Sequence, residues 1–130
     1  MNVIIDNDGS KPIYVQIAEW LETEIIKENF KVDEKIYSQY QLAEMLTINP
    51  ATAAKGLNIL ADKGILYKKR GLGMFVTGEA KQFIMAERKE QTLRKLVHEL
   101  VLEAYRLSVD EKEIMEMIQE MNKEIKGEKQ

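Results

Sequence analysis

Pro50 is the residue that most restricts how this chain can fold. It lies between the short stretch Thr-Ile-Asn at residues 47–49 and a run of strong helix formers. Proline lacks an N–H donor and breaks a helix interior, but it is favoured at the first helical position, where that donor is not needed. Asn49 directly before it is a preferred N-cap residue. We therefore predict that a helix begins at Pro50 and runs to about Lys63.

A short helix is predicted immediately before this one. Ser38 and Gln41 have the spacing of a capping box, in which the N-cap residue and the third helical residue bond each other's backbone. This helix is expected to end near Leu46, so that residues 47–49 form a tight turn between two helices. An amphipathic helix over residues 12–29 precedes the pair, since apolar residues recur there at helical spacing.

The composition changes again after Gly64, which is a typical helix stop. Residues 65–77 have the pattern of two strands around a glycine-flanked tip, which predicts a β-hairpin. Three cations, residues 68–70, precede the tip. The predicted fold is therefore mainly α with a small β-hairpin wing, a winged helix-turn-helix over residues 1–78. Residues 2–8 are expected to form a short strand or an arm.

The remaining residues, 79–130, are predicted to form a helical hairpin, with helices over 80–107 and 109–126. Ser108 and Glu111 have the spacing of a second capping box. A two-helix hairpin with apolar stripes cannot bury both faces by itself, so we expect a homodimer to complete the core. The expected dimerisation residues are Leu93, Leu96, Val97, Leu100, Val101, Ile114, Met117, Ile118 and Met121.

The start of the helix at Pro50 has the properties of a DNA-reading element. In a helix-turn-helix the second helix enters the major groove by its N-terminal end, whose N–H groups and dipole favour phosphate. Ala51 and Thr52 are small enough for close approach, and Lys55 can reach phosphate or guanine. The alternative for this stretch is a packed helix–helix turn. The basic wing favours DNA, because Lys69 and Arg70 at its tip can reach a narrow minor groove.

The composition sets limits on other functions. The net charge of −3 does not by itself indicate nucleic acid, but five cations and a single carboxylate lie between residues 45 and 78. The chain has no cysteine and one histidine, so we expect no disulfide and no metal site. No catalytic set is visible, and we expect neither an enzyme nor a cofactor. Without a signal peptide or membrane span in the sequence, a cytoplasmic protein is expected.

Residues 10–78 resemble the DNA-binding domain of the GntR family of bacterial transcription regulators, and its YtrA subfamily in particular. The matching segments are KPIYVQIAEWLETEII, the S-x-x-Q-LAE run at 38–44, INPATAAKGLNILADKGIL and KKRGLGMFV. The resemblance implies a dimeric repressor whose two-helix tail mediates dimerisation. It also implies double-stranded DNA with a pseudo-palindromic operator as the partner. By this resemblance the DNA-contacting positions are Ser38, Asn49, Ala51, Thr52, Lys55, Arg70, Gly71 and Gly73.

The sequence departs from the family's pattern at three positions near these contacts. Tyr37 stands where the family usually has a proline. Tyr40 stands where the family often has an arginine, and it is expected to contact the DNA backbone through its hydroxyl. Leu72 stands where the family usually has a basic residue at the wing tip. An unidentified small-molecule effector is expected to act by changing the angle between the two winged heads. The alternative function is a winged-helix protein-interaction module that does not bind DNA.

Overall fold

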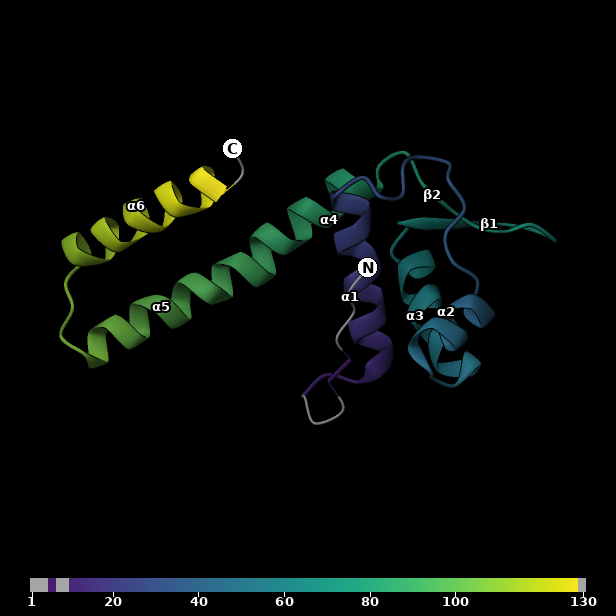
Figure 1. Cartoon of the computed structure of the whole chain (residues 1–130), viewed down its shortest axis with the longest axis horizontal. Coiled ribbons are helices and arrows are strands. Elements are labelled where there is room, and N and C mark those ends of the chain that lie inside the picture. Colours follow the sequence, from purple (N-terminus) through teal and green to yellow (C-terminus); the bar gives the residue numbers. More distant parts are fainter. Residues whose placement is uncertain (1–4, 7–9, 129–130) are drawn as a thin grey trace. The chain divides into compact units, whose positions relative to one another are not determined.

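The computed structural model describes residues 5–6 and 10–128, and Figure 1 shows its helices and strands. The helices of the first part are α1 (Ile13–Ile26), α2 (Gln39–Leu46), α3 (Pro50–Asp62) and α4 (Ala80–Arg88), with strands β1 (Leu66–Lys69) and β2 (Gly73–Val76) before α4. A π-helical turn, η1 (Lys89–Leu93), then leads to α5 (Arg94–Arg106) and α6 (Glu111–Glu128). This order confirms the mainly α fold with a hairpin wing.

The chain separates into two compact units, one ending at Glu87 and one beginning at Arg88. The sequence predicted a boundary between a DNA-binding part and a dimerisation part after residue 78. The division into compact units does not test which residues bind DNA or form a dimer, so that boundary stays a prediction. The strand or arm expected over residues 2–8 lies outside the described residues, apart from Ile5 and Asp6. The backbone N–H and carbonyl of Asp6 bond the side-chain amide of Gln16 at 2.8 Å each.

The core of the first unit is built where α1 meets α3. Ile17 and Leu21 of α1 and Leu60 of α3 are fully buried. At Gly56 the two helices leave no room for a side chain, because an added Cβ would lie 3.0 Å from the Tyr14 carbonyl oxygen and 3.1 Å from Ile17 Cγ2. Only glycine leaves both of these groups undisturbed. Figure 1 shows α2 on α3, beside the hairpin.

The predicted helix starts at Ser38 and Asn49 are confirmed in detail. The Ser38 hydroxyl accepts from the Gln41 N–H at 3.1 Å, and the Gln41 side chain accepts from the Ser38 N–H at 2.8 Å. The Asn49 side chain accepts from the Ala51 N–H at 2.8 Å, and Pro50 is the first residue of α3. These caps satisfy backbone donors that a helix start leaves without intrahelical partners. Together they determine where α2 and α3 begin.

The predicted end of the first helix and the predicted start of the last helix were both wrong, and in both places a residue with a left-handed backbone is the reason. Glu28 (φ 63°) and Ser108 (φ 57°) adopt the left-handed conformation and so close α1 and α5. The helix predicted to reach Asn29 therefore ends at Ile26. Ser108 cannot also serve as an N-cap, which needs an extended backbone. Asp110 takes that role, since its carboxylate accepts from the Glu113 N–H at 2.9 Å.

The wing is supported by a segment that the sequence indicated only as a polar connection. β1 and β2 are antiparallel, with Leu66 opposite Val76 and Lys69 opposite Gly73. Residues 33–36 then line the other edge of β2, where the Asp33 N–H donates to the Val76 carbonyl at 2.8 Å. The Tyr67 hydroxyl also donates to the Asp33 carboxylate at 2.7 Å, and this hydrogen bond raises the pKa of Tyr67.

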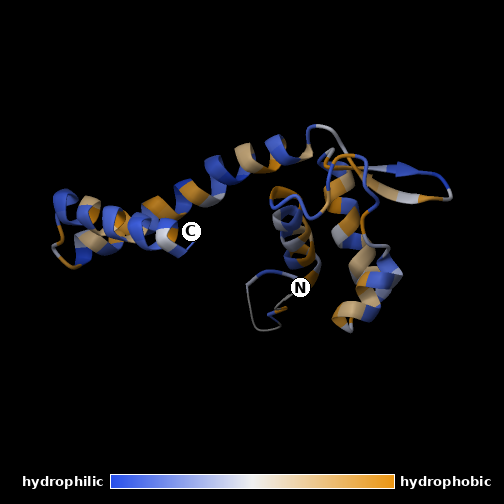
Figure 2. Cartoon of the chain, turned by 45° about the horizontal axis from the view of Figure 1, so that its top comes forward, coloured by the Kyte–Doolittle hydropathy of each residue, from blue (hydrophilic) through white to orange (hydrophobic). Residues whose placement is uncertain are grey.

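The second unit consists of α5 and α6 and buries little of its own apolar surface. Among its described residues, Ala104 is the one hydrophobic residue that is buried. Figure 2 shows hydrophobic residues alternating with hydrophilic ones along both helices. The continuous helix predicted over 80–107 is interrupted at Lys89–Leu93 by the π-helical turn. No helix in the described part of the chain has the length and apolar character needed to cross a membrane.

The close approach of α1 and α3 predicts a cost for any side chain at position 56. Gly56→Ala should lower the free energy of unfolding by about 1–3 kcal/mol, because the new methyl group meets a backbone carbonyl and a packed isoleucine. Urea denaturation followed by circular dichroism measures this change. Gly127→Ala is the control, since its Cβ would meet nothing within 4 Å. Equal stability of the Gly56→Ala variant and wild type would contradict this packing.

Candidate nucleic-acid interface

The outward face of α3 carries small residues at its start and one cation a turn later. Ala51, Lys55 and Asn58 are exposed, whereas Ala53, Gly56, Leu57 and Leu60 on the other side of the helix are buried. Thr52 and Ala54 are half-buried at the boundary between these faces. The first turn of α3 can therefore be approached closely by a large, flat or grooved partner.

Lys55 is held by an aromatic ring from α1. Its ammonium lies 5.2 Å from the centroid of the Tyr14 ring, within the range of a cation–π contact. The neighbouring Gly56 brings α1 close enough for Tyr14 to reach this position. The charge of Lys55 is thus kept near the start of α3 on its exposed face.

Lys63 belongs to the basic stretch of the sequence, but in the folded chain its charge is paired with two glutamates. Its ammonium lies 2.8 Å from Glu87 of α4 and 3.6 Å from the buried carboxylate of Glu22 in α1. Partial burial acts to lower the pKa of Lys63. The hydrogen bond to Glu87 and the charges of both glutamates outweigh burial, so this pKa lies above its ordinary value. Lys63 therefore adds no free positive charge to the surface around α3.

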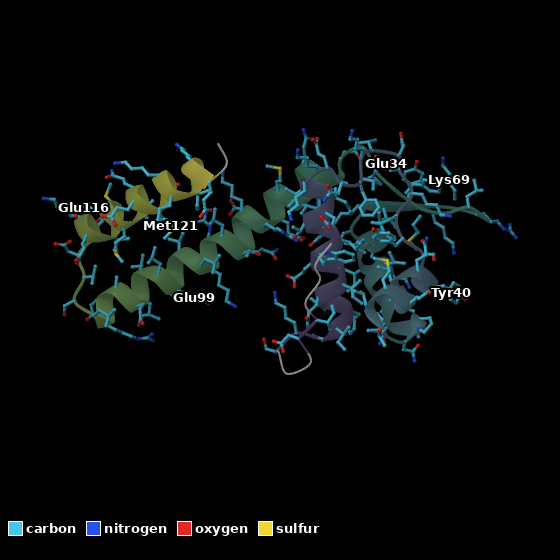
Figure 3. All side chains as sticks on the ribbon, in the orientation of Figure 1. Glu34, Tyr40, Lys69, Glu99, Glu116 and Met121 are labelled. Carbon is cyan, nitrogen blue, oxygen red and sulfur yellow. The ribbon has the colours of Figure 1, made fainter. Side chains whose placement is uncertain are left out.

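The hairpin presents its cations in different directions. Arg70 and Gly71 are exposed at the tip, where Gly71 (φ 78°) and Gly73 (φ 118°) have backbone conformations that favour glycine. Lys69, labelled in Figure 3, has its ammonium 4.6 Å from the Phe75 ring centroid. It therefore lies over the ring-bearing face of the ribbon. Lys68 lies on the other face, as expected for its neighbour in a strand.

A groove of about 340 Å³ joins α2, α3 and the hairpin. It is lined by Tyr37, Ser38, Gln39, Tyr40, Ala54, Leu57, Asn58, Lys68, Gly73 and Met74. The structure thus brings the predicted residues Ser38, Tyr40 and Gly73 together. Asn58 and Lys68 also line the groove but were missed from the sequence. Strand alternation was the available signal for Lys68, which shares a face with the buried Leu66.

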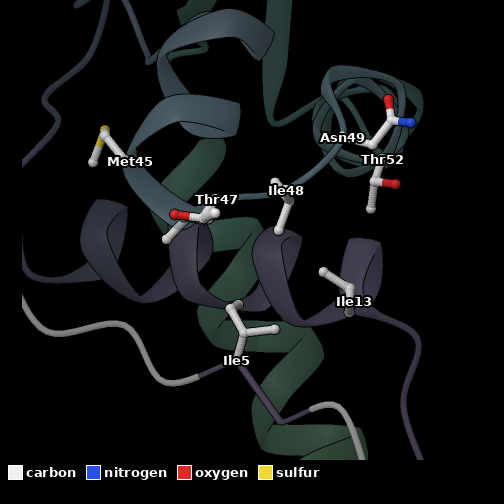
Figure 4. A pocket seen from close by; sticks show the side chains of 8 residues that line it. Ile5, Ile13, Met45, Thr47, Ile48, Asn49 and Thr52 are labelled. Carbon is white, nitrogen blue, oxygen red and sulfur yellow. The ribbon is translucent and has the colours of Figure 1, made fainter.

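A second hollow, of about 570 Å³, lies beneath the turn between α2 and α3. Figure 4 shows Ile5, Ile13 and Ile48 gathered around it, with Asn49 and Thr52 at its edge. The hydrogen bonds between Gln16 and Asp6 hold Ile5 in this place. It is lined by both apolar and polar residues, and it adjoins the capped start of α3.

The predicted site residues fall into three groups. Asn49, Ala51, Thr52 and Lys55 lie at the start of α3, Ser38 and Tyr40 at the start of α2, and Lys69, Arg70, Gly71 and Gly73 in the hairpin. The nine predicted dimerisation residues lie in the second unit, where all but the half-buried Ile114 are exposed. The described residues hold no group of three acidic, histidine or cysteine side chains that could bind a metal.

The comparisons with known proteins agree with this geometry. No family model matches the chain. The HTH-type transcriptional repressor YtrA of Bacillus subtilis is 29% identical over 123 residues, which cover 95% of this chain and 94% of that protein. The crystal structure of a GntR-family regulator from Bacteroides thetaiotaomicron is 31% identical, with a TM-score of 0.72, and covers 87% of this chain and 98% of its own.

A shorter match adds a structure with DNA. The DNA-binding domain of AraR in complex with an operator is 26% identical, with a TM-score of 0.54, and covers 59% of this chain and 96% of its own. The fold and these relatives define a winged helix-turn-helix regulator. The chain belongs to the GntR family of transcriptional regulators and is YtrA-like within it. Members of this family are regulators and not enzymes.

The Lys63 cluster predicts an energetic coupling between α3 and α4. Lys63→Met and Glu87→Gln should each lower the free energy of unfolding by about 1 kcal/mol at pH 7, a modest value because solvent screens this partly exposed pair. The double variant should lose less than the sum of the two. Because the pKa of Lys63 is raised, its contribution is fully present below pH 10.5 and is lost as the pH rises through the folded-state value.

Urea denaturation of the four proteins at pH 7 and above pH 10.5 measures this coupling. The coupling should be present at pH 7 and should shrink at the higher pH. Additive losses at pH 7 would show that the two side chains do not interact.

Proposed function

We propose that this chain is a homodimeric, sequence-specific DNA-binding repressor of transcription. Helix α3 enters the major groove by its N-terminal end, and the β1–β2 hairpin acts as a wing in the adjacent minor groove. The observation that carries the proposal is the exposed, small-residue first turn of α3, with Lys55 directly behind it. The YtrA relative, which is named as a repressor, and the operator-bound AraR domain support it.

The proposed contacts have different tasks on DNA. Thr52 and Lys55 can reach base edges, while the hydroxyls of Ser38 and Tyr40 are suited to the phosphate backbone. Arg70 stands at the exposed tip directly before Gly71, from which an arginine can enter a narrow minor groove. The proposed DNA-binding part comprises residues 1–78, and residues 79–130 are proposed for dimerisation.

The proposal of a homodimer rests on the apolar surface of α5 and α6. Leu96, Leu100 and Met121 are each more than 40% exposed. Exposed apolar stripes of this extent usually mark an interface. A second copy offers the same stripes, and two-fold symmetry would present two α3 helices to a pseudo-palindromic operator. An unidentified effector would then act on the angle between the two heads.

The DNA-binding proposal predicts that Lys55→Ala and Arg70→Ala each weaken operator binding by about 1–3 kcal/mol. Fluorescence anisotropy with a labelled duplex from upstream of the protein's own gene measures this at several salt concentrations. Wild-type affinity should fall steeply as salt increases, because bound phosphates release counterions. Lys123→Ala is the control, since it removes the same charge from an exposed position on α6. Losses equal to that of the control would favour the protein-interaction module.

The dimer proposal predicts that Leu100→Glu separates the two copies. A charge placed in an apolar interface must be desolvated without a partner, which is costly. Sedimentation velocity should give a dimer for wild type and a monomer for this variant. Glu99→Lys is the matched control, because it changes the charge of the adjacent exposed residue without touching the apolar stripe. A wild-type protein that sediments as a monomer would contradict the proposal.

A further inference from the structure

The two lysines of β1 lie on opposite faces of the hairpin. Neighbouring residues of a strand point to opposite sides, so Leu66 and Lys68 share one face and Tyr67 and Lys69 share the other. Leu66 is 2% exposed, which identifies the first face as the one toward the core. The ammonium of Lys69 lies 4.6 Å from the Phe75 ring centroid and 5.7 Å from that of Tyr67. The ammonium of Lys69 therefore contacts the two aromatic rings on the outer face.

Lys68 instead lines the groove between α2, α3 and the hairpin. It shares this groove with Tyr40 of α2 and Asn58 of α3, both exposed. None of the residues that line the groove in the described structure is acidic, and Lys68 is the charged one among them. The groove therefore combines a single cation with hydroxyl and amide groups, which are donors suited to a phosphate.

The proposed DNA contacts indicate what passes through this groove. A sugar–phosphate strand always separates a major groove from the adjacent minor groove. If α3 occupies the major groove and the wing the minor groove, that strand must run between α3 and the hairpin. The groove lined by Lys68 lies between these two elements, whereas the outer face that carries Lys69 does not border it.

We propose that Lys68 binds a backbone phosphate of the DNA duplex in this groove and that Lys69 does not. This inference rests on the proposed function of the chain. Lys68 supplies the positive charge that Tyr40 cannot supply from the opposite wall. A contact of this kind positions the duplex between α3 and the wing without reading its sequence.

The adjacent lysines form a matched pair for the experiment. Lys68→Met and Lys69→Met remove the same charge and keep an unbranched apolar stem, and both positions are exposed. Binding is measured by fluorescence anisotropy, over a series of salt concentrations, against the duplex from upstream of the gene and a scrambled duplex of the same length. Lys68→Met should weaken binding to both duplexes about tenfold. It should also reduce the slope of log affinity against log salt by about one for each protomer bound.

Lys69→Met should reduce the salt slope less than Lys68→Met does, because Lys69 lies on the outer face and does not line the groove. Tyr40→Arg, which places a cation on the same groove, should restore the slope of the Lys68→Met variant. Equal losses in the two lysine variants, or a larger loss in Lys69→Met, would overturn the inference while leaving the proposed function intact. Wild-type protein that binds neither duplex would overturn the proposed function and the inference with it.

Discussion

The close packing of α1 against α3 at Gly56 is the constraint on which the rest of the winged unit depends. The Tyr14 carbonyl oxygen of α1 lies only 3.0 Å from the place that a Cβ at position 56 would occupy, so this position admits no side chain without a shift. This contact fixes which side of α3 is buried, and Ala53, Leu57 and Leu60 fill the core on that side. Ala51, Lys55 and Asn58 must then face outward. The face available to DNA is in this way a consequence of where the core is.

The elements around α3 are fixed by local chemistry at its two ends. At the start, Asn49 and Pro50 leave only a tight turn after α2, so the two helices are held close together. At the end, Gly64 (φ 79°) turns the chain directly into β1, and the hairpin follows beside α3. Residues 33–36 then pair with β2 and hold the wing to the helical part. The groove that contains Lys68 results from this arrangement.

The features that could be predicted from the sequence are those with a local cause. The caps at Ser38 and Asn49, the stop at Gly64 and the glycine-flanked hairpin each depend on a few neighbouring residues. The features that were missed depend on residues far apart in the sequence. Lys63 was counted with the surface cations because its partners Glu22 and Glu87 come from other helices. Strand alternation places Lys68 and Lys69 on opposite faces of the hairpin, but only the packing of the hairpin beside α3 shows which face borders the groove.

In the proposed dimer, two copies of α3 read adjacent stretches of one DNA duplex. Hydroxyl-radical footprinting of the DNA upstream of the gene shows whether they do. We expect two protected stretches related by two-fold symmetry, with centres about one helical turn, or a whole number of turns, apart. A single protected stretch would contradict the symmetric dimer. Uniform cleavage along the duplex at saturating protein would contradict sequence-specific DNA binding altogether.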